Sequence, residues 1–130
     1  MISSATGLSK FCLEVSKFHR HFEGVEVDPK SLVTAPGTKE LIFLTMRVFN
    51  GPVILISPGW STYAPQVNLA GRRLQVVDTT ADTQWKVQPQ VLDAYLKQNC
   101  SQDENKLLVL NNPGNPSGTV YSPAELKSLV

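Results

Sequence analysis

The chain has 130 residues, enough for one domain of modest size with its own hydrophobic core. Its 12 basic and 11 acidic residues leave a formal net charge of +1, which gives no electrostatic reason to expect nucleic-acid or membrane partners. Cys12 and Cys100 lie in no metal-ligand spacing and are expected to be reduced thiols. Because no stretch has transmembrane length and the N-terminus lacks a signal-peptide pattern, we expect a cytoplasmic protein.

An amphipathic helix is predicted over residues 9–22. Its apolar residues recur at steps of four, three and four, which places them on one helical face: Phe11, Val15, Phe18 and Phe22. We expect that face to pack on a sheet. His19 and His21 near the helix end have no partner at metal-ligand or catalytic-triad spacing, so a surface or C-cap position is expected.

Two further segments precede the first apolar run. Residues 31–35 have the composition of a short strand that Pro36-Gly37 ends. Residues 38–49 are predicted to form a helix with apolar side chains on more than one face, so we expect it to be largely buried.

The rest of the chain alternates strands with helices. Strands are predicted at residues 53–56, 73–78 and 107–110, and helices at residues 61–70 and 89–98. Two of the strands are apolar runs without alternation, which is typical of parallel strands buried on both faces. The predicted fold class is therefore α/β, a three-layer α/β/α sandwich with a mostly parallel sheet.

The most informative stretch follows the last strand and reads Asn112-Pro113-Gly114-Asn115-Pro116-Ser117-Gly118. Two Asn-Pro pairs and two glycines require the chain to turn here. Ser122, Pro123 and Glu125 then predict a helix start with an N-cap, a proline at the first position and a capping box. Open α/β sheets bind ligands in loops of this kind, at the carboxyl ends of their strands.

Two other segments are candidates for ligand contact. Residues 36–40 open a helix, whose free N–H groups favour an anion such as phosphate, although an ordinary capped helix with solvated side chains is the alternative. Trp60 follows a strand-ending Pro58-Gly59, where its indole either stacks on an aromatic ligand or packs in the core. Tyr63, one helical turn onward, is a weaker site candidate and is expected to pack, and Trp85 is assigned to packing.

The loop resembles the Asn-Pro-x-Asn-Pro-Thr-Gly signature of fold-type I, pyridoxal-phosphate-dependent aminotransferases of class I/II, with Ser117 in place of the commoner Thr. The resemblance implies that Asn115 donates its amide to the phenolic oxygen of pyridoxal 5'-phosphate and that Trp60 stacks on the cofactor ring. It also assigns the cofactor phosphate to three residues, mainly through their backbone amides: Gly37, Thr38 and Lys39.

These three segments occur in the family's order. The amino-acid sequences of residues 60–71 and 111–126 most resemble those of the aspartate and prephenate aminotransferase branch. Two departures lie in the first helix, where Cys12 stands in place of a frequent Arg and Ser9 in place of Pro.

In the family, the Schiff-base Lys, the acidic partner of the pyridine nitrogen and the substrate-binding Arg all follow the signature. No Lys of this chain lies in the Schiff-base motif. We therefore expect residues 1–130 to be a partial pyridoxal-phosphate-binding large domain, without the N-terminal arm, the Schiff-base half and the small domain. Such a chain is expected to bind the cofactor weakly and to be inactive.

The resemblance implies that the full-length parent is a homodimer that transfers an amino group between an amino acid and a 2-oxo acid. No catalytic residue and no metal site is expected within this chain. Two alternatives stay open: a non-catalytic α/β module that binds a ligand or another subunit, and a pyridoxal-phosphate-dependent lyase of the same fold.

Overall fold

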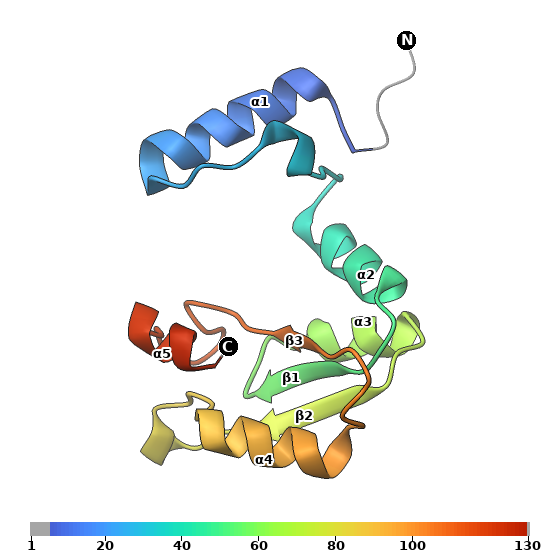
Figure 1. Cartoon of the computed structure of the whole chain (residues 1–130), viewed down its shortest axis with the longest axis vertical. Helices are drawn as coiled ribbons and strands as arrows, with labels where there is room; N and C mark the ends of the chain where they lie inside the picture. The colour runs from blue at the N-terminus through green and yellow to red at the C-terminus, as the bar shows by residue number, and fades with distance from the viewer. Residues whose placement is uncertain (1–5, 130) are drawn as a thin grey trace. The chain divides into compact units, whose positions relative to one another are not determined.

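The computed structural model describes residues 6–129. It divides into two compact units, Met1–Ile42 and Phe43–Val130 (Figure 1). Among the described residues, no helix is long and apolar enough to cross a membrane.

The first unit contains α1 (Ser9–Phe18), which continues into the π-helical turn η1 (His19–Glu23). The helix predicted over residues 9–22 is thus confirmed, and Gly24 ends it with a φ of 68°. Its buried residue is Cys12. The face predicted to pack on a sheet instead stays exposed, because its three phenylalanines are 54%, 52% and 68% accessible: Phe11, Phe18 and Phe22.

The strand predicted over residues 31–35 is wrong. The structure has a 3₁₀ turn, η2 (Pro29–Ser31), where the Asp28 side chain accepts a hydrogen bond of 2.9 Å from the backbone N–H of Lys30. This local cap competes with an extended backbone. Beyond the turn, Thr34 donates its backbone N–H to the carbonyl of Thr6 at 2.9 Å.

The helix predicted over residues 38–49 is confirmed as α2 (Thr38–Val48), which contains the boundary between the units. The expectation that it is largely buried is wrong. Met46 is buried, whereas Leu44 and Val48 are 43% and 80% exposed. The apolar residues of this helix on faces other than that of Met46 are therefore largely exposed.

The second unit is built on three parallel strands in the order β2-β1-β3. These are β1 (Val53–Ser57), β2 (Leu74–Asp78) and β3 (Leu107–Val109). In their register Leu55 lies opposite Val76 on one side and Val109 on the other. The predicted parallel sheet is confirmed. β3 is only half-buried, not buried on both faces as its apolar run predicts, because it lies at the edge of the described sheet.

Helices lie on both faces of this sheet. α3 (Tyr63–Leu69) and α4 (Pro89–Asn99) lie on opposite sides in Figure 1, and the 3₁₀ turn η3 (Ala81–Thr83) precedes α4. Pro65 falls within the first turn of α3, as its predicted helix requires. α5 (Pro123–Ser128) follows the signature loop and starts with the predicted capping box. The three-layer α/β/α architecture is therefore confirmed.

The core between the sheet and α4 is formed by five buried residues: Ile54, Val77, Val87, Leu92 and Tyr121. Tyr121 belongs to the segment between the signature loop and α5. The sheet core thus fixes the C-terminal side of that loop.

Candidate functional site

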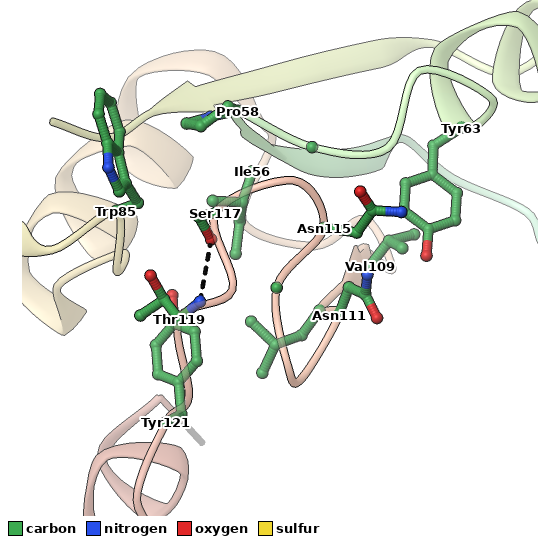
Figure 2. Close-up of a pocket in the computed structure, with 13 residues that line it drawn as sticks. Ile56, Pro58, Tyr63, Trp85, Val109, Asn111, Asn115, Ser117, Thr119 and Tyr121 are labelled. Carbon is green, nitrogen blue, oxygen red and sulfur yellow. Dashed lines mark hydrogen bonds between the residues drawn. The ribbon is translucent and has the colours of Figure 1, made fainter. Parts of the chain in front are cut away.

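A pocket lies where β1 and β3 end, the edge at which open α/β sheets bind ligands. Side chains from segments far apart in the sequence line it, among them Tyr63, Trp85, Asn111, Asn115, Thr119 and Tyr121 (Figure 2). Its volume is about 30 Å³. Because a cavity needs roughly 10–15 Å³ to hold one water molecule, this space suits a small polar substituent and not a whole aromatic ring.

The signature loop folds back on itself beside this pocket. The backbone N–H of Gly114 donates to the carbonyl of Thr119, and the N–H of Gly118 donates to the carbonyl of Gly114, both at 2.8 Å. The Ser117 hydroxyl accepts from the N–H of Thr119 at 3.3 Å. Gly118 has a φ of 69°, a conformation that side chains disfavour. The loop is therefore held by its own backbone, and Ser117 serves as a local turn residue.

The two asparagines of the signature have different environments. The Asn112 Oδ1 accepts from the backbone N–H of Tyr121 at 2.9 Å, and its Nδ2 donates to the Tyr121 carbonyl at 3.5 Å. The Asn115 side chain lines the pocket and makes no hydrogen bond within residues 6–129. Asn112 thus closes the loop, while the amide of Asn115 is left for a ligand.

Trp60 does not line the pocket that contains Asn115. It lies in a neighbouring hollow, and Tyr63 and Gly59 line both. The Trp60 and Tyr63 rings meet edge to face, with centroids 5.3 Å apart and planes at 89°. A Cβ on Gly59 would lie 2.6 Å from the Ile56 carbonyl, so this tight turn requires glycine. The role of Trp60 in ring stacking stays a prediction.

The predicted phosphate contacts lie at the start of α2, in the first unit. The backbone N–H groups of Glu40 and Leu41 donate to the carbonyl of Gly37 at 3.2 and 3.3 Å, so the helical bonding begins at that carbonyl. The amides of Gly37 and Thr38 precede this bonding, as is general for helix N-termini. No atom of a non-neighbouring residue lies within 4 Å of a Cβ built on Gly37. The phosphate role of Gly37, Thr38 and Lys39 stays a prediction.

Trp85 is the pocket residue that sequence reasoning missed. It was expected to pack, yet it lines the pocket and is 41% exposed. Gln84 and Trp85 have φ values of 55° and 57°, in the left-handed region. The Thr119 hydroxyl donates to the Gln84 carbonyl at 2.8 Å, which ties this turn to the signature loop. No local pattern distinguishes such a tryptophan from a core residue.

Further contacts join the segment after Trp85 to the residues that follow the signature loop. The Tyr121 hydroxyl accepts from the backbone N–H of Val87 at 2.7 Å, and burial raises the pKa of Tyr121. The Lys86 Nζ donates to both carboxylate oxygens of Glu125 at 2.8 and 3.1 Å. The pKa of Glu125 falls to about 2, first because of Lys86 and then because of its hydrogen bonds with Ser122. The loop is therefore anchored at its C-terminal end.

In the described part of the chain, the pocket has no lysine and no cluster of metal ligands is present. None of the described lysines lines the pocket. No group of three or more His, Cys, Asp or Glu side chains within residues 6–129 could hold a metal ion. The pocket therefore offers hydrogen-bonding groups and aromatic surfaces, suited to binding and orienting a ligand.

Comparison with protein families shows which family this chain is related to. The family described as aminotransferase class I and II matches residues 2–130. The chain belongs to this family. Its members use pyridoxal phosphate, so the cofactor implied by the signature is confirmed for the family. The residues fit that cofactor, because Asn115 presents an unpartnered amide to a pocket sized for one polar ring substituent.

Two curated relatives illustrate the match. The chain is 26% identical over 126 residues to the aspartate aminotransferase of Bacillus subtilis, covering 95% of this chain and 31% of that protein. It is 27% identical over 128 residues to the asparagine–oxo-acid transaminase of Streptococcus mutans, covering 96% and 31%. The chain thus spans about a third of the length of these relatives.

Solved structures agree on the fold. A mutant of Thermus thermophilus aspartate aminotransferase matches with a TM-score of 0.80 and 26% identity, covering 99% of this chain and 35% of that one. The aromatic aminotransferase of Pyrococcus horikoshii matches with a TM-score of 0.81 and 25% identity, covering 99% and 34%. The predicted fold of the pyridoxal-phosphate-dependent transferases is confirmed.

Proposed function

We propose that this chain supplies part of the cofactor site of a pyridoxal-phosphate-dependent aminotransferase, which transfers an amino group between an amino acid and a 2-oxo acid. The observation that carries the proposal is the Asn115 amide, which lines a pocket at the carboxyl ends of parallel strands and has no partner within residues 6–129. Membership of the aminotransferase family supports it independently.

Each candidate residue has a defined task. Asn115 donates its amide to the phenolic oxygen of the cofactor and orients the ring. Trp60, held edge to face by Tyr63, excludes water from one side of that ring. Gly37, Thr38 and Lys39 bind the phosphate through the amides of a helix N-terminus. Pyridoxal phosphate, when bound, supplies the electron sink for reactions at the α-carbon of an amino acid.

These residues bind and orient the cofactor, and none of them is proposed to form a Schiff base with it. Since no lysine of the described chain lines the pocket, we propose that the chain by itself binds the cofactor without turnover. We propose further that the full-length parent is a cytoplasmic homodimer. Proteins named for aspartate and asparagine transamination are similar to this chain, so these amino acids are the first donors to assay.

The first test is cofactor affinity. Titration of the chain with pyridoxal phosphate, followed by tryptophan fluorescence and equilibrium dialysis, is expected to give weak saturable binding. Asn115→Ala should weaken it about 3- to 10-fold, because one hydrogen bond contributes roughly 0.5–1.5 kcal/mol. Asn68→Ala, an exposed asparagine on α3, is the matched control and should bind as the wild type does.

Two results would contradict this proposal. Wild-type and Asn115→Ala chains that both fail to bind pyridoxal phosphate would favour the non-catalytic module. Cofactor-dependent conversion of aspartate or asparagine and a 2-oxo acid by the isolated chain would show that it carries its own amine, and would overturn the proposed lack of turnover.

A further inference from the structure

One wall of the pocket carries three polar side chains without partners. Tyr63, Asn111 and Asn115 all line it, and within residues 6–129 neither the Tyr63 hydroxyl nor either amide makes a hydrogen bond. Figure 2 shows the three on the same side of the pocket. Tyr63 and Asn111 are half-buried and Asn115 is exposed. The polar atoms of the three side chains are therefore accessible to a ligand that enters the pocket.

The opposite side of the pocket is aromatic. Trp85 and Tyr121 lie there in Figure 2; the Tyr121 hydroxyl accepts from the backbone N–H of Val87 at 2.7 Å, whereas the indole N–H of Trp85 makes no hydrogen bond within residues 6–129. Most of the unsatisfied hydrogen-bonding capacity of the pocket therefore lies on the side of Tyr63, Asn111 and Asn115. A space of about 30 Å³ beside these groups suits one polar atom at the edge of an aromatic ring.

Tyr63 also connects the pocket to Trp60. Its backbone N–H donates to the Trp60 carbonyl at 3.1 Å, and its ring meets the indole edge to face. Tyr63 is the first residue of α3 and lines both hollows, so the helix start sets the position of its backbone between them. One residue thus touches the aromatic platform and faces the polar pocket.

We propose that Tyr63 is a ligand-contacting residue of this site. Its hydroxyl, with the amides of Asn111 and Asn115, binds a polar atom at the edge of the pyridine ring, and its ring fixes the orientation of the Trp60 indole. The choice of pyridoxal phosphate as the ligand rests on the proposed function. Because the proposed function assigns Asn115 to the phenolic oxygen and the pocket has room for a substituent but not for the ring, the atom concerned is the phenolic oxygen, and ligand analogues that lack this oxygen or the ring nitrogen test the choice.

The test measures affinity and discrimination rather than turnover. Dissociation constants of the chain for pyridoxal phosphate, for its 3-deoxy analogue and for its 1-deaza analogue are compared with those of Tyr63→Phe. We expect Tyr63→Phe to bind pyridoxal phosphate about 3- to 10-fold more weakly, as for the loss of one hydrogen bond. We also expect it to lose most of the wild-type discrimination against one analogue, which identifies the contacted atom. A structural role alone would not change that discrimination.

A second variant isolates the ring. Tyr63→Leu removes both the hydroxyl and the edge-to-face contact, so its affinity should fall by a further 2- to 10-fold, in the range of aromatic pair contributions. Tyr95→Phe is the control, because the Tyr95 hydroxyl bonds Gln75 at 2.9 Å and does not line the pocket. It should leave affinity and discrimination unchanged.

The outcomes separate the two proposals. If Tyr63→Phe binds and discriminates as the wild type does while Asn115→Ala binds weakly, the role of Tyr63 is overturned and the proposed function stands. If the wild type binds none of the three ligands, both are overturned.

Discussion

At the scale of single residues, the two asparagines of the signature differ, because one closes the loop and the other lines the pocket. Asn112 closes the loop through two hydrogen bonds to the backbone of Tyr121, whereas Asn115 makes none within residues 6–129. Both follow the same sequence context, an asparagine before a proline. Their roles differ because only one side chain points back to the strand-to-helix connection.

This difference predicts that replacement of asparagine by alanine destabilises the fold at position 112 but not at position 115. Asn112→Ala should lower the free energy of unfolding by about 1–3 kcal/mol, because it leaves the Tyr121 N–H without its acceptor. Asn115→Ala should leave that free energy unchanged within about 0.5 kcal/mol. Urea denaturation followed by circular dichroism measures both. Equal destabilisation by the two substitutions would show that Asn115 also holds the loop.

The glycines and the asparagine pair of the site could be predicted from the sequence, because turns and signatures are local. Trp85 and Tyr63 could not be assigned. An aromatic residue beside a turn has the same local pattern whether it enters a core or lines a pocket. Tertiary contacts bring Trp85 to this site, among them the hydrogen bond from Thr119 to the Gln84 carbonyl.

At the scale of elements, the capping residues in the sequence correctly predicted where α5 starts. The Ser122 hydroxyl accepts from the Glu125 N–H at 3.2 Å, and the Glu125 carboxylate accepts from the Ser122 N–H at 2.7 Å. Lys86 adds a contact that no local pattern contains, since it comes from a segment 39 residues away. The helix start is thus set locally and anchored by a tertiary ion pair.

The Glu125 contacts predict a pH dependence. The pKa of Glu125 is lowered from 4.5 to about 2 in the folded chain. Its ionised form therefore stabilises the fold above about pH 4.5, and this contribution is lost as the pH falls toward 2. The difference in unfolding free energy between wild type and Glu125→Gln should be largest near pH 6 and shrink steadily below pH 4.5.

Urea midpoints measured between pH 2.5 and 6 check this dependence. Lys86→Met removes the largest cause of the lowered pKa, so the loss of stability that Glu125 causes on acidification should be smaller and should be complete at a higher pH. A wild-type minus Glu125→Gln difference that is the same at pH 2.5 and pH 6 would contradict the assignment.

Local structure also explains why the strand predicted over residues 31–35 is wrong. Its composition favours an extended backbone, and Leu32 is indeed extended, with φ −89° and ψ 137°. The Asp28 side chain bonds the Lys30 N–H, and the 3₁₀ turn that follows includes Ser31. Within residues 6–129 no sheet strand pairs with residues 32–35, and an extended segment without a ladder is not a strand.

At the scale of the whole molecule, the two borders of the sheet differ. On β2, the outward N–H of Val76 donates to the Tyr95 hydroxyl at 3.2 Å. On β3, the Leu107 N–H donates to the Pro52 carbonyl, so the backbone polar groups of Leu107 and Val109 face β1. Because these groups alternate in direction along a strand, the N–H and carbonyl of Leu108 point outward. No strand within residues 6–129 pairs with that edge. An open edge of this kind is a site for strand pairing.

We therefore expect concentration-dependent self-association of the isolated chain through β3, measurable by analytical ultracentrifugation. Leu108→Pro removes the outward N–H and should abolish most of it, since proline is tolerated on an edge strand. Leu108→Ala is the matched control, because it removes the same side chain and keeps the N–H. If both variants associate equally, the edge backbone is not the contact.

The sequence by itself determined the alternation of strands and helices, the capping box of α5 and the signature loop that contains Asn115. These features depend on side-chain periodicity, turn residues and hydrogen bonds between near neighbours, all of which are local. The tertiary structure alone decided which side chains meet. The parallel order β2-β1-β3 places the ends of β1 and β3 beside each other, and it thereby brings Tyr63, Trp85 and Tyr121 to the loop of Asn115. No spacing along the chain encodes that convergence, because it depends on contacts between segments far apart in the sequence.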